Sequence, residues 1–120
     1  MHPKSGEGLI DEAKKQIQEV TPEQVREMQA RKEKAVYLDV REPAEWNLGR
    51  LPGAVLLPRG NLETKVEGLV DRKERVVVYC ARGNRSALAA LTMKQMGYEN
   101  VASMSGGIQG WAAIDGEIEE

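Results

Sequence analysis

Two nearly continuous apolar runs stand out along the chain, at residues 35–40 and residues 75–80. Both are rich in residue types that favour strands, and neither alternates strictly with polar residues. An unbroken apolar run of this length is typical of a strand that is covered on both faces, as in a parallel sheet. Shorter runs at residues 54–57 and 101–104 predict two further strands, and residues 18–20 predict a short edge strand.

Helical patterns separate these runs. Apolar residues at i, i+3 and i+7 predict an amphipathic helix over residues 9–17. The next helix has clear start signals, because Thr21 suits the N-cap, Pro22 the first helical position and Gln24 the third position of a capping box. This helix is expected to end near Lys32. Further helices are predicted over residues 43–46, 62–70, 86–93 and 108–113.

Strands that alternate with helices at this spacing indicate βαβ units. The chain is therefore predicted to be an α/β protein with a mainly parallel sheet and helices on both faces. One boundary falls near residues 18–21, so we divide the chain into an N-terminal helical extension, residues 1–18, and an α/β body, residues 19–120. In such sheets ligands bind at the carboxyl ends of the strands.

The composition narrows the range of functions. A chain of 120 residues has the size of one domain. Its 17 lysines and arginines nearly balance 19 aspartates and glutamates, so there is no broad basic field for nucleic acid. No stretch approaches the roughly 20 apolar residues of a membrane span, and the N-terminus lacks the apolar run of a signal peptide. We therefore expect a cytoplasmic protein without a nucleic-acid or membrane partner.

The chain has one cysteine, Cys80, and one histidine, His2. A single cysteine excludes an internal disulfide and a zinc site built from several cysteines. The histidine stands at the chain start, so a catalytic pair with a histidine base would depend on a terminal residue. Any chemistry at Cys80 is therefore expected to proceed without a histidine base.

Cys80 ends the most apolar strand and stands before a predicted helix, which is where active sites lie in parallel sheets. In the loop that follows, Gly83 allows the backbone to curl so that N–H groups point inward and form an anion cradle with the helix start. Arg82 and Arg85 add positive charge. These effects favour the thiolate, so we predict that the pKa of Cys80 lies below its usual value of about 8.5. A lone cysteine is more commonly a small core residue, but this loop favours the reactive interpretation.

Two other pairs of residues have both a functional and a structural interpretation. Asp39 and Arg41 lie at the carboxyl end of their strand and could border the same pocket as Cys80. An ion pair that holds the strand end is the preferred interpretation. Trp46 and Trp111 could line the pocket mouth, but packing is preferred because the chain contains no phenylalanine.

Three segments resemble the rhodanese-like sulfurtransferases. Residues 80–86, which read C-A-R-G-N-R-S, resemble the active-site loop of that family. Residues 38–46, followed by residues 49–58, are similar to its first signature, D-V-R-E-x-x-E-W and then G-H-I-x-G-A-x-x-I-P. Residues 101–111 are similar to its second signature, a valine strand followed by a pair of glycines and a tryptophan. The three motifs occur in the family's order and with its spacing.

This resemblance implies a doubly wound, five-stranded parallel sheet in a rhodanese-like domain. It also implies transfer of a sulfane sulfur from a small anionic donor such as thiosulfate to a thiophilic acceptor, either cyanide or a thiol, including a thiol protein. Cys80 would carry the sulfur as a persulfide, Arg85 would brace the loop, and Arg82 would attract the anionic donor. No metal or organic cofactor is implied. The residues implied to bind the substrate are Ala81, Arg82, Gly83, Asn84, Arg85 and Ser86.

The chain departs from the first signature at one position, where Arg50 stands in place of the usual histidine. We expect this change to affect local packing rather than catalysis.

Two other functions remain open. A cysteine phosphatase also uses a strand–loop–helix cradle and an arginine, but with five residues between them, whereas four residues separate Cys80 from Arg85. The shorter loop is expected to suit one sulfur better than a phosphate group. A persulfide carrier or a regulatory module of the same fold is the second alternative, because the sequence does not identify the donor, the acceptor or the oligomeric state.

Overall fold

The computed structural model describes residues 4–120, so His2 lies outside the described residues. Five strands form one sheet in the order β1-β5-β4-β2-β3, and every neighbouring pair is parallel. The strands are β1 (Gln18–Val20), β2 (Val36–Asp39), β3 (Val55–Leu56), β4 (Val76–Tyr79) and β5 (Val101–Met104). The predicted α/β class and the five-stranded parallel sheet are confirmed.

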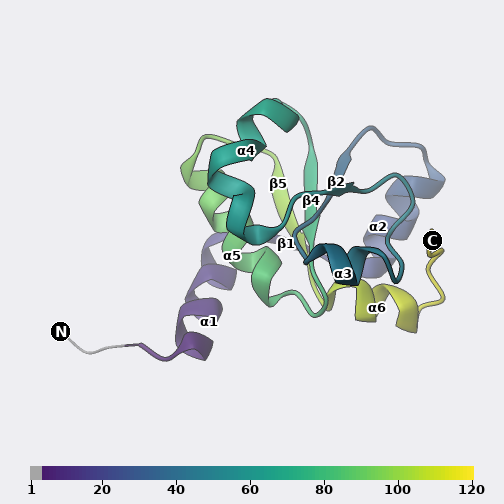
Figure 1. Cartoon of the computed structure of the whole chain (residues 1–120), viewed down its shortest axis with the longest axis horizontal. Helices are drawn as coiled ribbons and strands as arrows, with labels where there is room; N and C mark the ends of the chain where they lie inside the picture. Colours follow the sequence, from purple (N-terminus) through teal and green to yellow (C-terminus); the bar gives the residue numbers. More distant parts are fainter. Residues whose placement is uncertain (1–3) are drawn as a thin grey trace.

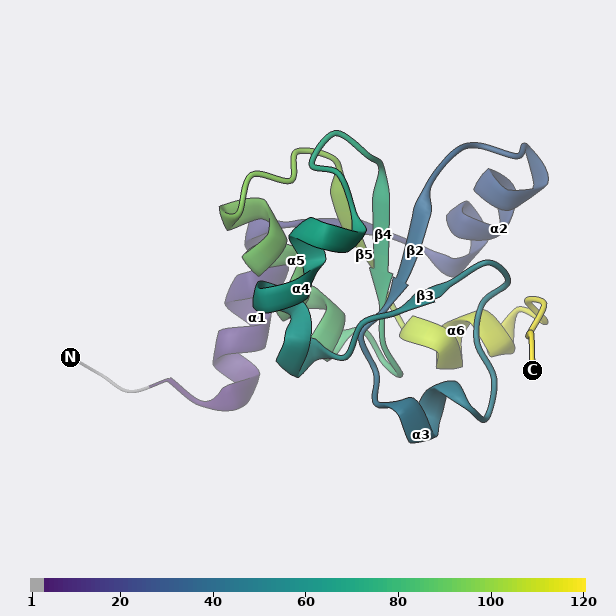
Figure 2. The same ribbon diagram turned by 45° about the horizontal axis from the view of Figure 1, so that its top comes forward.

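Helices cover both faces of this sheet. They are α1 (Gly6–Gln16), α2 (Pro22–Ala30), α3 (Pro43–Trp46), α4 (Leu62–Leu69), α5 (Asn84–Gln95) and α6 (Gly107–Ala113). Helices α1, α4 and α5 lie on one side of the sheet and α2 and α6 on the other, which is the doubly wound arrangement (Figures 1 and 2). Within residues 4–120, no helix has both the length and the apolar character that crossing a bilayer requires.

The central strand β4 shows why its sequence is continuously apolar. Val76 and Val78 join the core cluster beneath α4 and α5. Val77 and Tyr79 join the cluster on the opposite face, beneath α2 and α6. Because successive side chains of a strand point to opposite faces and both faces are covered, every position of β4 has to be apolar.

The N-terminal helix α1 is longer than predicted and packs against the body of the protein. It begins at Gly6 rather than near residue 9, because the Ser5 hydroxyl caps it by accepting a hydrogen bond from the Gly8 amide at 2.9 Å. Its apolar side lies against α5, where Ala13 is only 1% exposed. The chain then leaves the helix and adds β1 to the sheet beside β5.

Two predictions about individual elements were wrong in detail. The run at residues 54–57 forms a strand of only two residues, because β3 lies at the edge of the sheet, where Val55 is 40% exposed. Helix α5 begins at Asn84, two residues before the predicted start.

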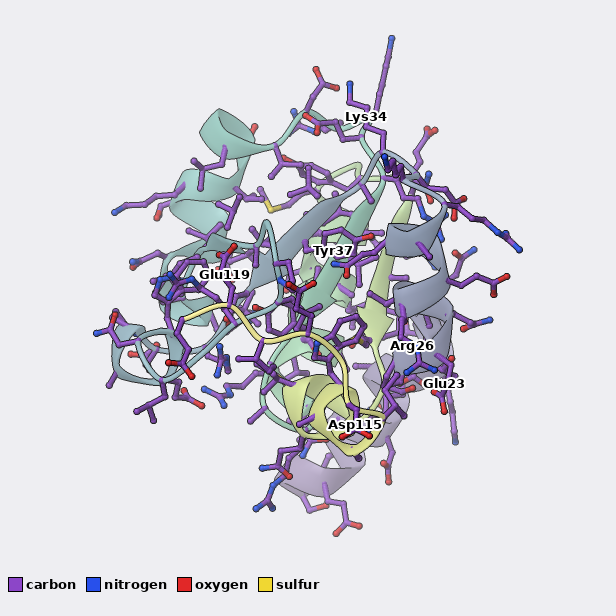
Figure 3. The ribbon with its side chains drawn as sticks, turned by 90° about the vertical axis from the view of Figure 1, so that its right-hand side faces the viewer. Glu23, Arg26, Lys34, Tyr37, Asp115 and Glu119 are labelled. Atoms are coloured by element: carbon purple, nitrogen blue, oxygen red, sulfur yellow. The ribbon has the colours of Figure 1, made fainter. Side chains whose placement is uncertain are left out.

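Arg50 packs between a tryptophan and the C-terminal segment. Its guanidinium group lies over the Trp46 ring, 4.6 Å from the centroid. Its backbone exchanges two hydrogen bonds with Glu119, at 3.0 and 2.8 Å. Figure 3 shows the C-terminal segment crossing this face of the protein from Asp115 to Glu119. The same segment accepts a hydrogen bond from the buried Trp111 indole at the Glu117 carbonyl. Arg50 is therefore a packing residue in this chain.

The contact between α1 and α5 gives a testable prediction about stability. We expect Ala13→Glu to lower the free energy of unfolding by about 2–4 kcal/mol, because the substitution forces a carboxylate into a closely packed helix contact. Urea unfolding followed by circular dichroism measures this difference. The matched control is Ala30→Glu, at an exposed alanine in the last turn of α2. Equal stability of the two variants would contradict the packing of α1 on α5.

Candidate active site

Strand β4 delivers Cys80 to the carboxyl edge of the sheet, at the base of a small pocket. The cysteine is 1% exposed, and the pocket above it has a volume of about 170 Å³. The pocket is lined by Cys80, Ala81, Arg82, Asn84 and Arg85. A larger hollow of about 470 Å³ exists elsewhere, between the ends of α1 and α5, and Cys80 is not among the residues that line it. All five lining residues of the small pocket are among those predicted from the sequence.

The loop after Cys80 points hydrogen-bond donors at its sulfur. The Gly83 amide donates to Sγ at 3.1 Å, and the Ser86 amide lies 3.4 Å from the same atom. The Ser86 hydroxyl oxygen is also 3.4 Å from Sγ. Gly83 is the N-cap of α5 and has φ of +100°, a left-handed conformation that glycine adopts without steric cost. The curl that the sequence predicted is therefore present.

The start of α6 fixes this loop from behind. The Ile108 amide donates to the Cys80 carbonyl at 2.8 Å, and the Gln109 amide donates to the Ala81 carbonyl at 3.1 Å. In a trans peptide the C=O and N–H groups point in opposite directions. The next two amides in the loop therefore face away from α6. Helix α6 thus determines which side of the loop presents N–H groups.

Opposing effects act on the pKa of Cys80. Burial raises it, because the charged thiolate loses contact with water. Hydrogen bonds from the Ser86 hydroxyl and from the amides of Ser86, Gly83 and Arg82 lower it. The hydrogen bonds outweigh burial, so the pKa of Cys80 lies below its ordinary value. The direction agrees with the prediction from the sequence, and hydrogen bonds are its principal cause.

Arg85 is held by a carboxylate that the sequence analysis did not identify. Its two terminal nitrogens donate to the two oxygens of Glu45, at 2.7 and 2.9 Å. Glu45 lies in α3, which places this carboxylate beside the active-site loop although it is 40 residues away in the chain. The hydrogen bonds from Arg85 are the main cause of a pKa of about 2 for Glu45. The pair is therefore charged on both sides at neutral pH and braces the loop against α3.

Asp39 and Arg41 form a buried ion pair, with Arg41 Nη2 and Asp39 Oδ2 2.6 Å apart. Neither residue lines the pocket over Cys80. Arg41 also donates to the backbone carbonyls of Gly49 at 2.8 Å and Glu45 at 3.3 Å. The pair therefore holds the segment that carries α3, and it acts on the pocket only through Glu45.

Arg82 and Asn84 are exposed at the mouth of the pocket. Arg82 forms no ion pair within residues 4–120. The Asn84 side chain accepts a hydrogen bond from Lys14 of α1 at 3.3 Å, a contact that the sequence did not predict. No group of three or more acidic, histidine or cysteine side chains suited to a metal ion occurs in this described part of the chain.

Two further residues near Cys80 were missed as parts of the site. Gly107 has φ of +57°, and a Cβ atom there would lie 2.4 Å from the Cys80 carbonyl oxygen. The Gly106–Gly107 pair was a pattern in the sequence that could have identified Gly107 as a position where the backbone makes a close contact. Ser103 is fully buried, and its hydroxyl lies 2.8 Å from that of Ser86. No local sequence pattern marks this serine.

Comparison with known proteins shows which family the chain matches. Residues 21–114 match the Rhodanese-like domain family. A protein of Allochromatium vinosum named sulfurtransferase is 32% identical over 96 residues, which cover 80% of this chain and 89% of that protein. The probable adenylyltransferase/sulfurtransferase MoeZ of Mycobacterium tuberculosis is 35% identical over 95 residues. That match covers 78% of this chain but only 24% of MoeZ, so the chain spans about a quarter of this longer relative.

Two solved structures are similar over almost the whole chain. One is a protein of unknown function from Rhodopseudomonas palustris, described as a possible tyrosine phosphatase. It has a TM-score of 0.89 and 30% identity, and the match covers 99% of this chain and 97% of that one. The other is a thiosulfate sulfurtransferase from Pseudomonas aeruginosa, with a TM-score of 0.83 and 30% identity. That match covers 96% of this chain and 22% of the other.

The contact of Gly107 with the loop gives a testable prediction. We expect Gly107→Ala to displace the Cys80 and Ala81 carbonyls and to raise the pKa of Cys80, because the added Cβ cannot be accommodated at 2.4 Å. The rate of alkylation by iodoacetamide as a function of pH measures this pKa. Gly60→Ala is the matched control, since a Cβ there meets no atom within 4 Å. An unchanged profile in Gly107→Ala would contradict the role of α6 in orienting the loop.

The Glu45–Arg85 pair predicts a dependence of stability on pH. The folded-state pKa of Glu45, about 2, lies below its ordinary value of 4.5. The stability that the charged carboxylate contributes is therefore complete above pH 4.5 and is lost as the pH falls toward 2. We expect Glu45→Gln to be less stable than the wild type at pH 7, and the difference to shrink at acid pH.

Urea unfolding at several pH values checks this dependence. Glu27→Gln serves as the control, because Glu27 belongs to an exposed ion pair with Arg31, the residue that follows α2. A destabilisation by Glu45→Gln that stays the same from pH 7 to pH 2 would show that the charged pair is not its cause.

Proposed function

Because the chain belongs to the rhodanese-like domain family, whose members include sulfurtransferases, we propose that it transfers a sulfane sulfur through a persulfide on Cys80. This proposal rests on the position of the Cys80 sulfur. It lies at the base of a small pocket, and several hydrogen-bond donors are directed at it. A thiolate stabilised in this way is a nucleophile without the help of a base.

The first step takes the sulfur from a donor, for which we propose thiosulfate. The Cys80 thiolate attacks the outer sulfur of thiosulfate and forms a new S–S bond. The S–S bond within the donor breaks, and sulfite leaves with the electron pair of that bond. Arg82, exposed at the mouth of the pocket, attracts the dianionic donor. The similarity to the thiosulfate sulfurtransferase of Pseudomonas aeruginosa supports this choice of donor.

The second step passes the sulfur on. A thiolate or cyanide attacks the outer sulfur of the persulfide, and the bond to Cys80 Sγ breaks with its electrons remaining on Sγ. The products are an acceptor persulfide or thiocyanate and the original Cys80 thiolate. The inward-facing amides of the loop stabilise the negative sulfur in both steps, because they are already oriented before the reaction begins.

A cysteine phosphatase is a less favoured alternative, and the Rhodopseudomonas palustris protein is the reason to test it. A phosphatase with this kind of cradle needs its arginine to bind phosphate oxygens. Here both terminal nitrogens of Arg85 already bind Glu45. Displacing them would leave the Glu45 carboxylate without its partner beside an incoming anion. This geometry favours sulfur transfer over phosphate hydrolysis.

A persulfide carrier that serves a partner protein is the second alternative. The site chemistry is the same, and only the rate of release to small acceptors differs. Fast turnover with cyanide or small thiols supports a free-standing enzyme, whereas single loading with slow release supports a carrier.

Intact-mass spectrometry tests the proposal directly. After incubation with thiosulfate we expect the protein to gain the mass of one sulfur atom, and cyanide should remove it. Cys80→Ser, which keeps the size of the side chain but lacks the thiolate, should gain nothing. The same samples assayed with p-nitrophenyl phosphate test the alternative.

Two results would overturn the assignment. One is sulfur loading in Cys80→Ser, which would place the chemistry elsewhere. The other is hydrolysis of the phosphate ester that depends on Cys80, in a protein that gains no sulfur from thiosulfate or from an organic persulfide.

A further inference from the structure

One buried hydroxyl group close to Cys80 has no role in the steps above. Ser103 lies in β5 and is fully buried. Its neighbours on the same face of the sheet belong to the apolar core cluster under α4 and α5. Within residues 4–120, the side chain of Ser103 hydrogen-bonds to one other side chain, the hydroxyl of Ser86, at 2.8 Å. A polar group in such surroundings is costly unless it is paired.

The sheet explains why Ser103 meets the active site. In the pairing of β4 with β5, Ser103 stands opposite Val78. Side chains two positions apart in an extended strand point to the same face, so Val78 and Cys80 share a face. Ser103 therefore projects toward the side on which Cys80 lies. From the other side, the first turn of α5 brings Ser86 between them, 3.4 Å from the sulfur.

We propose that Ser103 is a positioning residue that orients the Ser86 hydroxyl toward the sulfur of Cys80. This inference rests on the proposed function, since it concerns the same reactive sulfur. In the described part of the chain, Ser103 forms no hydrogen bond to the sulfur and does not line the pocket, so it acts through Ser86.

The numbers of hydrogen bonds that the two serine hydroxyls can donate and accept explain this role. A hydroxyl has one hydrogen to donate and two lone pairs to accept with. When Ser103 donates to the Ser86 oxygen, the single hydrogen of Ser86 remains for the thiolate. When Cys80 is a neutral thiol, its S–H donates to Ser86, and the Ser86 hydrogen can turn to the Ser103 oxygen.

Ser86 thus keeps two hydrogen-bond partners, Ser103 and Cys80, in both protonation states of Cys80. When the thiol ionises, the donors and acceptors in this row of three side chains exchange roles. In the thiolate state, the bond from Ser103 also polarises the Ser86 hydroxyl and strengthens its bond to sulfur. Without Ser103, the Ser86 hydroxyl would have one partner fewer and would be free to rotate away from the sulfur.

The first test removes the Ser103 hydroxyl and measures the ionisation of Cys80. We expect Ser103→Ala to raise the pKa of Cys80 by about 0.5–1 unit, which corresponds to the weakening of one hydrogen bond to the thiolate. The readout is the rate of alkylation by iodoacetamide from pH 5 to pH 10. Rates of variant and wild type should converge at the alkaline end, where both are fully ionised.

Two further variants control for side effects. Ser103→Thr retains a hydroxyl and should restore a pKa close to that of the wild type. Ser105→Ala removes a hydroxyl just beyond the end of the same strand that bonds to the Val20 carbonyl and not to the active site. It should leave the alkylation profile unchanged.

A double-mutant comparison decides whether Ser103 acts through Ser86. In a Ser86→Ala background, Ser103→Ala should produce no further change in the pKa of Cys80. An equal shift in both backgrounds, or no shift in either, would overturn the proposal. If Ser103→Ala does not fold, Ser103→Val against Ser103→Thr repeats the comparison between side chains of equal size.

Alkylation does not depend on sulfur transfer, so this result stands apart from the proposed function. If the protein never forms a persulfide but Ser103→Ala shifts the pKa of Cys80, the proposed function is wrong and the role of Ser103 is supported. If the protein forms a persulfide but Ser103→Ala leaves the pKa of Cys80 unchanged, the function is supported and the role of Ser103 is wrong.

Discussion

A negatively charged sulfur that is almost fully buried is stable only if enough hydrogen-bond donors face it, and the surroundings of Cys80 meet this requirement. The N-cap and first turn of α5 supply two amides and a hydroxyl. Helix α6 supplies none directly, but it binds the carbonyls that would otherwise be free to face the sulfur. Each contribution is small, and together they outweigh the cost of burial.

Residues at the end of β2 and in α3 also hold this loop in place, although they do not line the pocket. Asp39 neutralises Arg41 at the end of β2, and Arg41 binds the backbone around α3. Helix α3 then presents the Glu45 carboxylate to Arg85. Asp39 and Arg41 therefore form the structural ion pair that was the preferred interpretation of the sequence. They fix the position of an arginine, which in turn fixes the loop.

Local patterns accounted for the elements but not for the contacts between them. Strand β4 and the capped start of α2 were predictable because their signals lie within a few residues: a run covered on both faces, and the Thr21–Gln24 capping box. The candidate loop was predictable for the same reason. Glu45 and Ser103 were not, because each acts on a residue 17 or more positions away, and nothing in its neighbourhood of the chain shows which partner it meets. The exposure of Val55 likewise depends on β3 being the edge strand, which only the strand order shows.

The dependence of the loop on α6 also links the reactivity of Cys80 to the packing of a distant segment. Cys80 and the amides that bind it lie in one loop, but the carbonyls of that loop are held by residues 107–109, further along the chain. If α6 detaches, the Cys80 and Ala81 carbonyls lose the partners that turn them away from the sulfur, and the thiol becomes harder to ionise. Local opening at α6 should therefore weaken the nucleophile before the sheet itself unfolds.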